Sequence, residues 1–276
     1  MASPAKPIVL YDIAMREPRE KTCCSPNPWK ARLALNFKGL PNVTKWVPLP
    51  EIATVRKGLH LPPVRKFADG TDFYTLPIIE DPNNNSEMVG DSFDIAVYLQ
   101  KTYPDAGRGD LFPEQTLDFT HDLANILVPL SEWEGKEHPE YARFNASVDA
   151  AFSVHVGLGV GNFPFDEASA EATKAEFVRR AGFKSWEDFL LVGEAREKVK
   201  SSFRDTLEGL ARLFQRDESG PFLLGEKASY ADLIVGAWLR MIVVTFPRED
   251  WEDVRGWYGG VFGRLHDALD VLAEVK

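Results

Sequence analysis

The first hundred residues alternate between short apolar runs and amphipathic helical patterns. The runs are rich in β-branched and aromatic residues, which favour strands, and the segments between them repeat apolar positions at helical spacing. The predicted strands are Ile8–Ile13, Thr44–Leu49, Leu76–Glu80 and Met88–Val89, and the predicted helices are Pro28–Phe37, Glu51–Leu59 and Ser92–Tyr103. This β-α-β-α-β-β-α order predicts a mixed sheet, because strand–helix–strand crossovers make parallel pairs and a tight turn makes an antiparallel pair.

After Pro104 the pattern is helical throughout. A Gly- and Asp-rich linker, residues 105–112, leads into segments without a convincing strand, and Ser229 and Asp232 form a structural capping box ahead of an apolar run. The predicted helices are Glu114–Trp133, Glu140–Val156, Ala168–Arg180, Ser185–Phe214, Tyr230–Thr245, Glu249–Tyr258 and Val261–Ala273. We therefore predict an α/β domain over residues 1–104 and an all-α domain over residues 113–276.

The charge balance narrows the class of partner. The chain has 276 residues and a formal net charge of −10. Such a charge argues against nucleic acid and anionic membranes as main partners, because both attract basic proteins. No apolar run approaches the ~20 residues that a membrane span requires, and residues 1–7 lack the apolar core of a signal peptide. The expected location is the cytosol.

Cysteine and histidine usage gives no sign of a disulfide framework or a metal site. The only two cysteines, Cys23 and Cys24, are adjacent, and vicinal cysteines rarely bridge each other. The five histidines are scattered along the chain without the spacing of zinc ligands. We expect a reducing compartment and no bound metal.

The most informative stretch runs from Cys23 to Arg32, with the sequence Cys-Cys-Ser-Pro-Asn-Pro-Trp-Lys-Ala-Arg. It opens a predicted helix, whose N-terminus offers unpaired N–H groups and a positive dipole end to a thiolate. Ser25 can donate a hydrogen bond to the thiolate of another molecule. Cys24 could instead be the thiolate itself, which would mean disulfide exchange. A third interpretation makes both cysteines small, half-buried and unreactive.

Two further motifs occupy loops of the first predicted domain. Leu76-Pro77 precedes a strand, and a cis peptide bond there would let the Leu76 backbone pair with an extended peptide ligand. Spacing alone favours an ordinary trans proline at this point. Gly90-Asp91-Ser92 precedes a helix, where Asp91 and Ser92 can act as caps and leave N–H groups free for a carboxylate. On its own, this motif predicts simple capping.

In this order, and ahead of an all-helical domain, the three motifs resemble the glutathione transferases of the thioredoxin-like fold. The stretch from Ser25 to Gly39 resembles the active-site helix of omega-type members, with serine where those members carry cysteine. Ser-Pro-Asn-Pro-Trp-Lys at 25–30 and Asp-Ser-Phe-Asp-Ile-Ala-Val-Tyr-Leu at 91–99 resemble the fungal-specific class A transferases, relatives of bacterial lignin β-etherases. The resemblance covers most of the chain and implies glutathione as co-substrate and a homodimer.

The resemblance also implies roles for individual residues. Ser25 would donate to the glutathione sulfur and lower its pKa from the ~8.5–9 of a free thiol. The thiolate would then attack an electrophilic carbon, reduce a peroxide or displace an aryl-ether oxygen. The implied glutathione-binding residues are Asn27, Leu76, Pro77, Asp91 and Ser92. A cation from the second helix should bind the glycyl carboxylate; Lys57 is the candidate, with Arg56 and Lys66 as competitors.

The hydrophobic substrate site is expected between the two domains. Its candidates are Phe119, Leu123 and Trp133 of the predicted helix 114–133 and Phe163 of the interrupted stretch Gly161–Phe165. A broad aromatic pocket suits planar phenolic ligands, and the fungal class implies wood polyphenols. The alternative functions are a carrier that binds polyphenols without catalysis and a thiol transferase, or deglutathionylase, that uses Cys24. A structural or regulatory module is disfavoured because all three motifs occur together.

Overall fold

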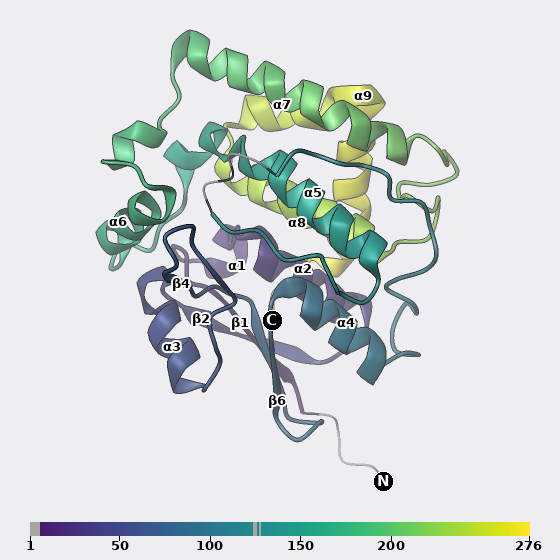
Figure 1. Cartoon of the computed structure of the whole chain (residues 1–276). Coiled ribbons are helices and arrows are strands. Elements are labelled where there is room, and N and C mark those ends of the chain that lie inside the picture. Colours follow the sequence, from purple (N-terminus) through teal and green to yellow (C-terminus); the bar gives the residue numbers. More distant parts are fainter. Residues whose placement is uncertain (1–5, 124–125, 127) are drawn as a thin grey trace.

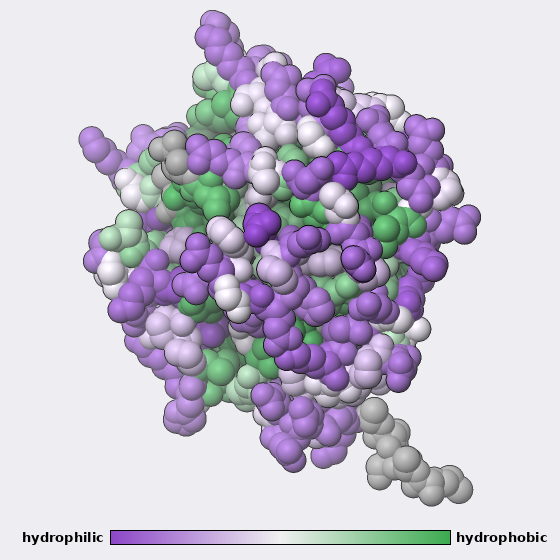
Figure 2. Space-filling model, turned by 45° about the vertical axis from the view of Figure 1, so that its right-hand side comes forward, coloured by the Kyte–Doolittle hydropathy of each residue, from purple (hydrophilic) through white to green (hydrophobic). Residues whose placement is uncertain are grey.

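The computed structural model describes residues 6–123, 126 and 128–276, and it joins an α/β unit to a helical unit (Figure 1). The thioredoxin-like α/β fold and the all-α fold that follows it confirm the predicted fold class. None of the helices in the described part of the chain is long and apolar enough to cross a membrane. Polar side chains cover most of the face shown in Figure 2, and apolar side chains gather there in separate patches.

A four-stranded mixed sheet forms the centre of the α/β unit. Its strands are β1 (Ile8–Ile13), β2 (Asn42–Val47), β5 (Ile78–Asp81) and β6 (Glu87–Gly90), in the spatial order β2-β1-β5-β6. Strand β1 runs parallel to β2, with Leu10 opposite Thr44, and antiparallel to β5, with Leu10 opposite Ile79. Strands β5 and β6 form the antiparallel hairpin that the short turn predicts.

Short helices and one small hairpin complete this unit. The helices are α1 (Arg19–Thr22), α2 (Pro26–Phe37), α3 (Ile52–Gly58) and α4 (Ser92–Thr102), with a 3₁₀ turn at Leu49–Glu51. Strands β3 (Arg65–Lys66) and β4 (Asp72–Phe73) form a separate hairpin that the sequence pattern did not predict. Two residues per strand are too few to show a period of two.

The described part of the helical unit contains five longer helices. They are α5 (Pro139–Ser153), α6 (Ala170–Ala181), α7 (Gly193–Phe214), α8 (Tyr230–Thr245) and α9 (Arg248–Ala268), with 3₁₀ turns at Val156–Leu158, Val160–Asn162, Trp186–Phe189 and Asp270–Leu272. Residues 257–260 leave the helical conformation inside α9, where the sequence predicts a break between two helices. The capping box is formed: Asp232 Oδ2 accepts from the Ser229 N–H at 2.7 Å and from Ser229 Oγ at 2.8 Å.

The predicted helix Glu114–Trp133 is wrong. Its described residues contain no helix and run as an irregular segment across the helical unit (Figure 1), while its residues 124, 125 and 127 lie outside the described part. Pro129 lacks an N–H and disfavours helical backbone in the residue before it. Side chains of other elements bind the backbone carbonyls instead: Arg216 donates to Thr116 O at 3.3 Å and Arg65 to Pro129 O at 2.6 Å.

Helix α2 lies at the centre of the core. It packs against α4 and β1 on the sheet side and against α8 of the helical unit. Nine of its residues are buried, including Lys30 and Arg32. Charged side chains this far from water require partners, and each has one: Asp12 of β1 pairs with Arg32, and Asp149 of α5 pairs with Lys30. The N-terminus of α2, where Ser25 stands, is therefore held from both units.

Candidate functional site

Ser25 is the N-cap residue of α2, but its hydroxyl does not cap the helix. The residue has extended backbone (φ −65°, ψ 123°), is partly exposed, and makes no side-chain capping hydrogen bond. Pro26 and Pro28 have no N–H, so Asn27 supplies the one backbone donor among the first three helical positions. A hydroxyl that has no hydrogen-bond partner among the described residues and a single N–H thus stand at the positive end of a well-packed helix.

The cysteines beside Ser25 lie inside the protein. Cys23 and Cys24 are free thiols with 2% and 0% exposure. Burial raises the pKa of the Cys23 thiol to about 12, and it raises the pKa of Cys24 further, with Cys23 and Asp12 adding to the effect. The indole of Trp29 holds this turn by donating to Cys23 O at 2.8 Å. A thiol that is covered and protonated is a poor nucleophile, which stands against the Cys24 hypothesis.

The second motif differs from the expectation based on spacing. The Leu76–Pro77 peptide bond is cis, so the trans proline favoured by spacing alone is wrong. Both residues are buried, and β5 begins directly after them at Ile78. The Asp91 N–H donates to Pro77 O at 3.4 Å, which brings the second and third motifs side by side.

The third motif caps α4, as predicted. Asp91 has a positive φ of 98°, and its Oδ1 accepts from the Phe93 N–H at 2.9 Å. Its other oxygen is bound as well: Arg65 Nη2 lies 2.5 Å from Oδ2, and Ser131 Oγ lies 3.0 Å from it. Burial raises the pKa of the Asp91 carboxyl, but the charge of Arg65 and these hydrogen bonds outweigh it and hold the pKa below its ordinary value.

Arg65 and Ser131 were missed by sequence reasoning. Arg65 stands in the unpredicted hairpin, and Ser131 stands in the segment that was expected to be helical. Neither lies in a recognisable motif, and each reaches Asp91 from a distant part of the chain. Only the fold brings them together.

Asn27 connects the first motif to the third. Ser92 Oγ lies 3.5 Å from Asn27 Oδ1, and Lys30 Nζ donates to the same oxygen at 3.0 Å. The carbonyl of Ser92 accepts a hydrogen bond from Tyr230 Oη of α8 at 2.9 Å. The N-termini of α2 and α4 therefore face each other, and the structure brings together Asn27, Pro77, Asp91 and Ser92, with Ser25 two residues from Asn27.

The three basic candidates differ in their surroundings. Arg56 is 3% exposed and donates to Pro62 O and Thr75 O, so it stabilises a loop. Lys57 is exposed, with Nζ 5.2 Å from the ring centroid of Tyr74. Lys66 is exposed in β3. Of the three, only Lys57 combines a solvent-exposed ammonium with a contact to the residues just before Leu76.

The four hydrophobic candidates have different neighbours. Phe119 is buried edge-to-face against Phe144 of α5, and Leu123 is 41% exposed. Trp133 lies under the guanidinium of Arg143. Phe163 stacks on Phe165 and borders Phe177 of α6. The difference between buried Phe119 and exposed Leu123 agrees with the irregular path of the described residues in 114–133, because a helix would have placed both on one face.

One described cavity lies elsewhere in the helical unit. It has a volume of about 820 Å³ and is lined by residues of α7 and α9, among them Lys200, Arg204 and Trp257. None of the predicted site residues lines it. It is a polar groove between two helices, which does not match the expected aromatic pocket.

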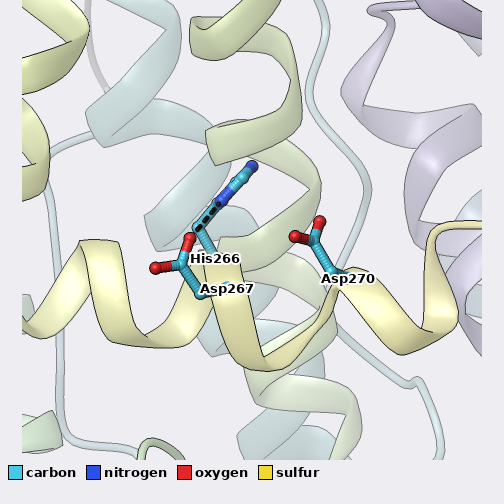
Figure 3. Close-up of side chains that lie close together, drawn as sticks. All are labelled: His266, Asp267 and Asp270. Carbon is cyan, nitrogen blue, oxygen red and sulfur yellow. Dashed lines mark hydrogen bonds and ion pairs between the residues drawn. The ribbon is translucent and has the colours of Figure 1, made fainter.

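One group of side chains has the composition of a metal site. Within the described ranges, His266, Asp267 and Asp270 alone bring three potential ligands together (Figure 3). His266 Nδ1 contacts Asp267 Oδ1 at 3.2 Å, but Arg255 already pairs with Asp267 at 2.8 Å and Arg240 with Asp270 at 2.5 Å. Both carboxylates are thus neutralised, and the arrangement is that of an ion-pair network at the end of α9.

Comparisons with known proteins agree with this geometry. The family signature described as "Glutathione S-transferase, N-terminal domain" matches residues 24–102, and "Glutathione S-transferase, C-terminal domain" matches residues 166–272. The glutathione S-transferase-like protein ustS of Aspergillus flavus is 27% identical, over 95% of this chain and 89% of the relative. The chain belongs to the glutathione S-transferase family.

Solved structures give the same result. Glutathione transferase GSTFuA3 from Phanerochaete chrysosporium is 28% identical with a TM-score of 0.76, covering 99% of this chain and 100% of that chain. The glutathione S-transferase CsGST63524 of Ceriporiopsis subvermispora, solved in complex with glutathione, is 29% identical with a TM-score of 0.76, covering 98% and 99%. The protein is therefore a glutathione S-transferase.

Proposed function

We propose that Ser25 activates the glutathione thiol for attack on hydrophobic, aromatic electrophiles. The observation that supports this is the free hydroxyl of Ser25 at the N-terminus of α2, beside the single backbone donor of Asn27. Each unit of pKa depression requires about 1.4 kcal/mol of preferential stabilisation of the thiolate. A charge-assisted hydrogen bond together with the helix dipole supplies roughly one to two units.

The remaining glutathione contacts follow from the motifs that the fold gathers. Leu76 and Pro77 hold the cysteinyl backbone. Asp91 and Ser92 bind the ammonium and carboxylate of the γ-glutamyl group. Asp91 carries the negative charge that an ammonium requires, because Arg65 and its hydrogen bonds hold the pKa of its carboxyl below the ordinary value. Lys57 binds the glycyl carboxylate. These assignments support one orientation, with the sulfur at the N-terminus of α2.

The finer features of the enzyme are also proposals. We assign it to the fungal-specific class A and expect it to conjugate electrophiles, reduce peroxides or cleave aryl ethers, and to bind wood polyphenols near Phe163 and Trp133. We expect a cytosolic homodimer whose glutathione-binding domain spans residues 1–104. Residues 105–112 link it to the helical substrate domain, residues 113–276. The similarity to GSTFuA3 and to the Ceriporiopsis transferase supports the class.

The serine assignment is tested by comparing Ser25→Ala with Cys24→Ser. Glutathione affinity, the ultraviolet absorbance of bound thiolate and turnover with a panel of aryl electrophiles are measured for each protein. We expect Ser25→Ala to raise the pKa of bound glutathione by about one unit and to lower turnover at least tenfold. Cys24→Ser should leave both unchanged. The reverse result, loss in Cys24→Ser alone, would establish the thiol transferase instead.

A further inference from the structure

A buried lysine lies directly behind the proposed sulfur site. Lys30, on the first turn of α2 after Asn27, is 0% exposed. Its ammonium donates three hydrogen bonds: to Asn27 Oδ1 at 3.0 Å, to Asn145 Oδ1 at 2.8 Å and to Asp149 Oδ1 at 2.5 Å. The three N–H donors of the ammonium are thus matched by three acceptors, one on α2 and two on α5 of the helical unit.

The partners of Lys30 are themselves fixed. Asp149 Oδ1 also accepts from Trp238 Nε1 of α8 at 2.7 Å, so three elements meet at this carboxylate. Asn145 is 1% exposed, and its Nδ2 has no hydrogen-bond partner among the described residues. An unsatisfied buried amide costs free energy. The Asn145 amide accepts this cost and keeps its oxygen toward Lys30. The ammonium therefore determines which way the amide faces.

The same logic applies to Asn27. An ammonium carries donors and no acceptor, so only the oxygen of an amide can face it. The Ser92 hydroxyl approaches that oxygen too, at 3.5 Å. Because Asn27 Oδ1 faces Lys30 and Ser92, the NH₂ group of Asn27 is turned away from Lys30. Asn27 is partly exposed and stands two residues after Ser25 at the open N-terminus of α2.

We propose that Lys30 is a positioning residue, which holds Asn27 so that its side-chain NH₂ donates a second hydrogen bond to the glutathione thiolate beside Ser25. The proposal rests on the function proposed above. Through Asp149 and Trp238, Lys30 also makes this orientation depend on the docking of the helical unit. Lys30 touches no substrate, and its effect passes through Asn27.

Electrostatics agrees with a lysine kept in place by its partners. Burial lowers the pKa of the Lys30 ammonium below its ordinary value, and the charge and hydrogen bond of Asp149 offset only part of this lowering. Asp91 favours the charged form and Arg65 opposes it. Removing Lys30 alone would leave Asp149 as an uncompensated buried charge, so a useful variant must neutralise both residues.

The experiment is a double-mutant cycle on the pKa of bound glutathione. The variants are Asn27→Ala, which keeps the backbone N–H, the neutral pair K30M/D149N, and their combination. Thiolate absorbance is recorded against pH, with the kcat and KM for glutathione measured separately. The matched control is R32M/D12N, which neutralises the other buried ion pair of α2 on the side facing the sheet.

We expect Asn27→Ala and K30M/D149N each to raise the pKa of the bound thiol by about half a unit to one unit, which lowers the thiolate fraction about three- to tenfold at a pH below it. The effect should appear in kcat, with KM within about twofold. The combined variant should show no further shift, because Lys30 acts through Asn27. R32M/D12N should keep the wild-type profile.

Several outcomes would overturn the proposal. A wild-type pKa profile in Asn27→Ala would show that the Asn27 side chain donates no hydrogen bond to the thiolate. Additive pKa shifts in the combined variant would show that Lys30 acts independently of Asn27. An equal shift in R32M/D12N would reduce the role of Lys30 to general support of α2. If K30M/D149N does not fold, Asn27→Ala still decides whether the Asn27 side chain donates to the thiolate, the step through which Lys30 would act. Failure of the proposed function is distinct, because then the wild-type protein itself forms no thiolate near neutral pH.

Discussion

Arg32 Nη2 of α2 donates to Asp12 Oδ2 of β1 at 2.7 Å, and both side chains are buried. The guanidinium also binds Thr44 Oγ1 of β2 at 2.8 Å and lies over the ring of Trp29. One side chain therefore attaches α2 to two strands. Burial raises the pKa of the Asp12 carboxyl in spite of this pairing, so the carboxylate depends on its partner.

The first prediction concerns this pair. Arg32→Met should lower the free energy of unfolding by about 3–5 kcal/mol, because Asp12 would remain buried without its counter-charge. Urea unfolding followed by circular dichroism measures the loss. R32M/D12N should recover most of it, since no charge is then left unpaired. A loss below about 1 kcal/mol in the single variant would mean that solvent reaches Asp12.

The second prediction concerns the two cysteines. Both thiols should react with iodoacetamide at least about a hundredfold more slowly in the native protein than in denaturant, because burial keeps them protonated and covered. Mass spectrometry of alkylated peptides measures each site. The pKa of about 12 for Cys23 means that the native rate should stay low up to pH 9. Rapid labelling of Cys24 alone would revive the disulfide-exchange hypothesis.

The third prediction separates the three basic candidates. Lys57→Ala should raise the KM for glutathione about five- to tenfold with little change in kcat, because it removes a contact that substrate and transition state share. Lys66→Ala is the matched control and should leave both constants unchanged. Arg56→Ala should instead lower the melting temperature, since its guanidinium holds Pro62 O and Thr75 O. Steady-state kinetics and thermal unfolding together decide the assignment.

The sequence was sufficient where the pattern is local. The helix that follows Ser25, the cap at Asp91 and the capping box at Ser229 each follow from residues within a few positions of one another, and the structure contains all three. Helix α2 begins at Pro26, two residues before the predicted start at Pro28. The break in α9 is also local, because Gly259 and Gly260 tolerate the positive φ that the turn requires.

The local sequence pattern did not predict the contacts between residues that are distant in the chain. Arg65 reaches Asp91 across 26 positions from a hairpin with two residues per strand. Residues 114–133 carry apolar positions at helical spacing, but their backbone binds side chains of distant elements such as Arg216. The local sequence predicts that Lys30 is a surface cation of an amphipathic helix. Its burial becomes evident only from the position of α5, which carries its partners Asn145 and Asp149. The peptide geometry at Pro77 likewise has no local signal.

The fourth prediction concerns the capping box. Burial raises the pKa of Asp232 to about 6, although hydrogen bonds from Leu223 and Ser229 lower it. The unfolded chain releases this proton near its ordinary pKa of ~3.9. Between about pH 4 and 6 the folded state therefore holds a proton that the unfolded state has lost, and stability falls as pH rises through this window.

Unfolding free energies of wild type and Asp232→Asn, measured from pH 4 to 7, isolate this contribution. The free energy of unfolding of Asp232→Asn should not fall between pH 4 and 6. The difference in this free energy between the two proteins should therefore change across the window and be constant above it. Asp232→Ala should cost roughly 1–2 kcal/mol above this window, because the cap itself is lost, and more below it, where the proton bound by Asp232 stabilises the wild-type protein. Parallel curves for wild type and Asp232→Asn would show that the carboxyl titrates at its ordinary pKa.

The fifth prediction concerns the contact between α6 and the α/β unit. Glu176 accepts from Arg179 at 2.8 Å and from Arg180 at 2.7 Å, and Arg180 in turn donates to Tyr74 O at 3.3 Å. Partial burial raises the pKa of Glu176, but the two arginines outweigh it and lower the pKa to about 2. Its stabilising contribution is therefore complete above about pH 4.5 and is lost as the pH falls toward 2.

Glu176→Gln should lower the unfolding free energy by about 0.5–1 kcal/mol at pH 7, and the difference from wild type should disappear near pH 2. The matched control is Glu171→Gln, which breaks the exposed pair with Lys174 on the same helix and should have a smaller effect. Because Arg180 also lies over Phe73, protease cleavage in the β3–β4 hairpin should increase only in Glu176→Gln. Equal stability and equal cleavage in the two variants would show that Glu176 does not hold α6 against the α/β unit.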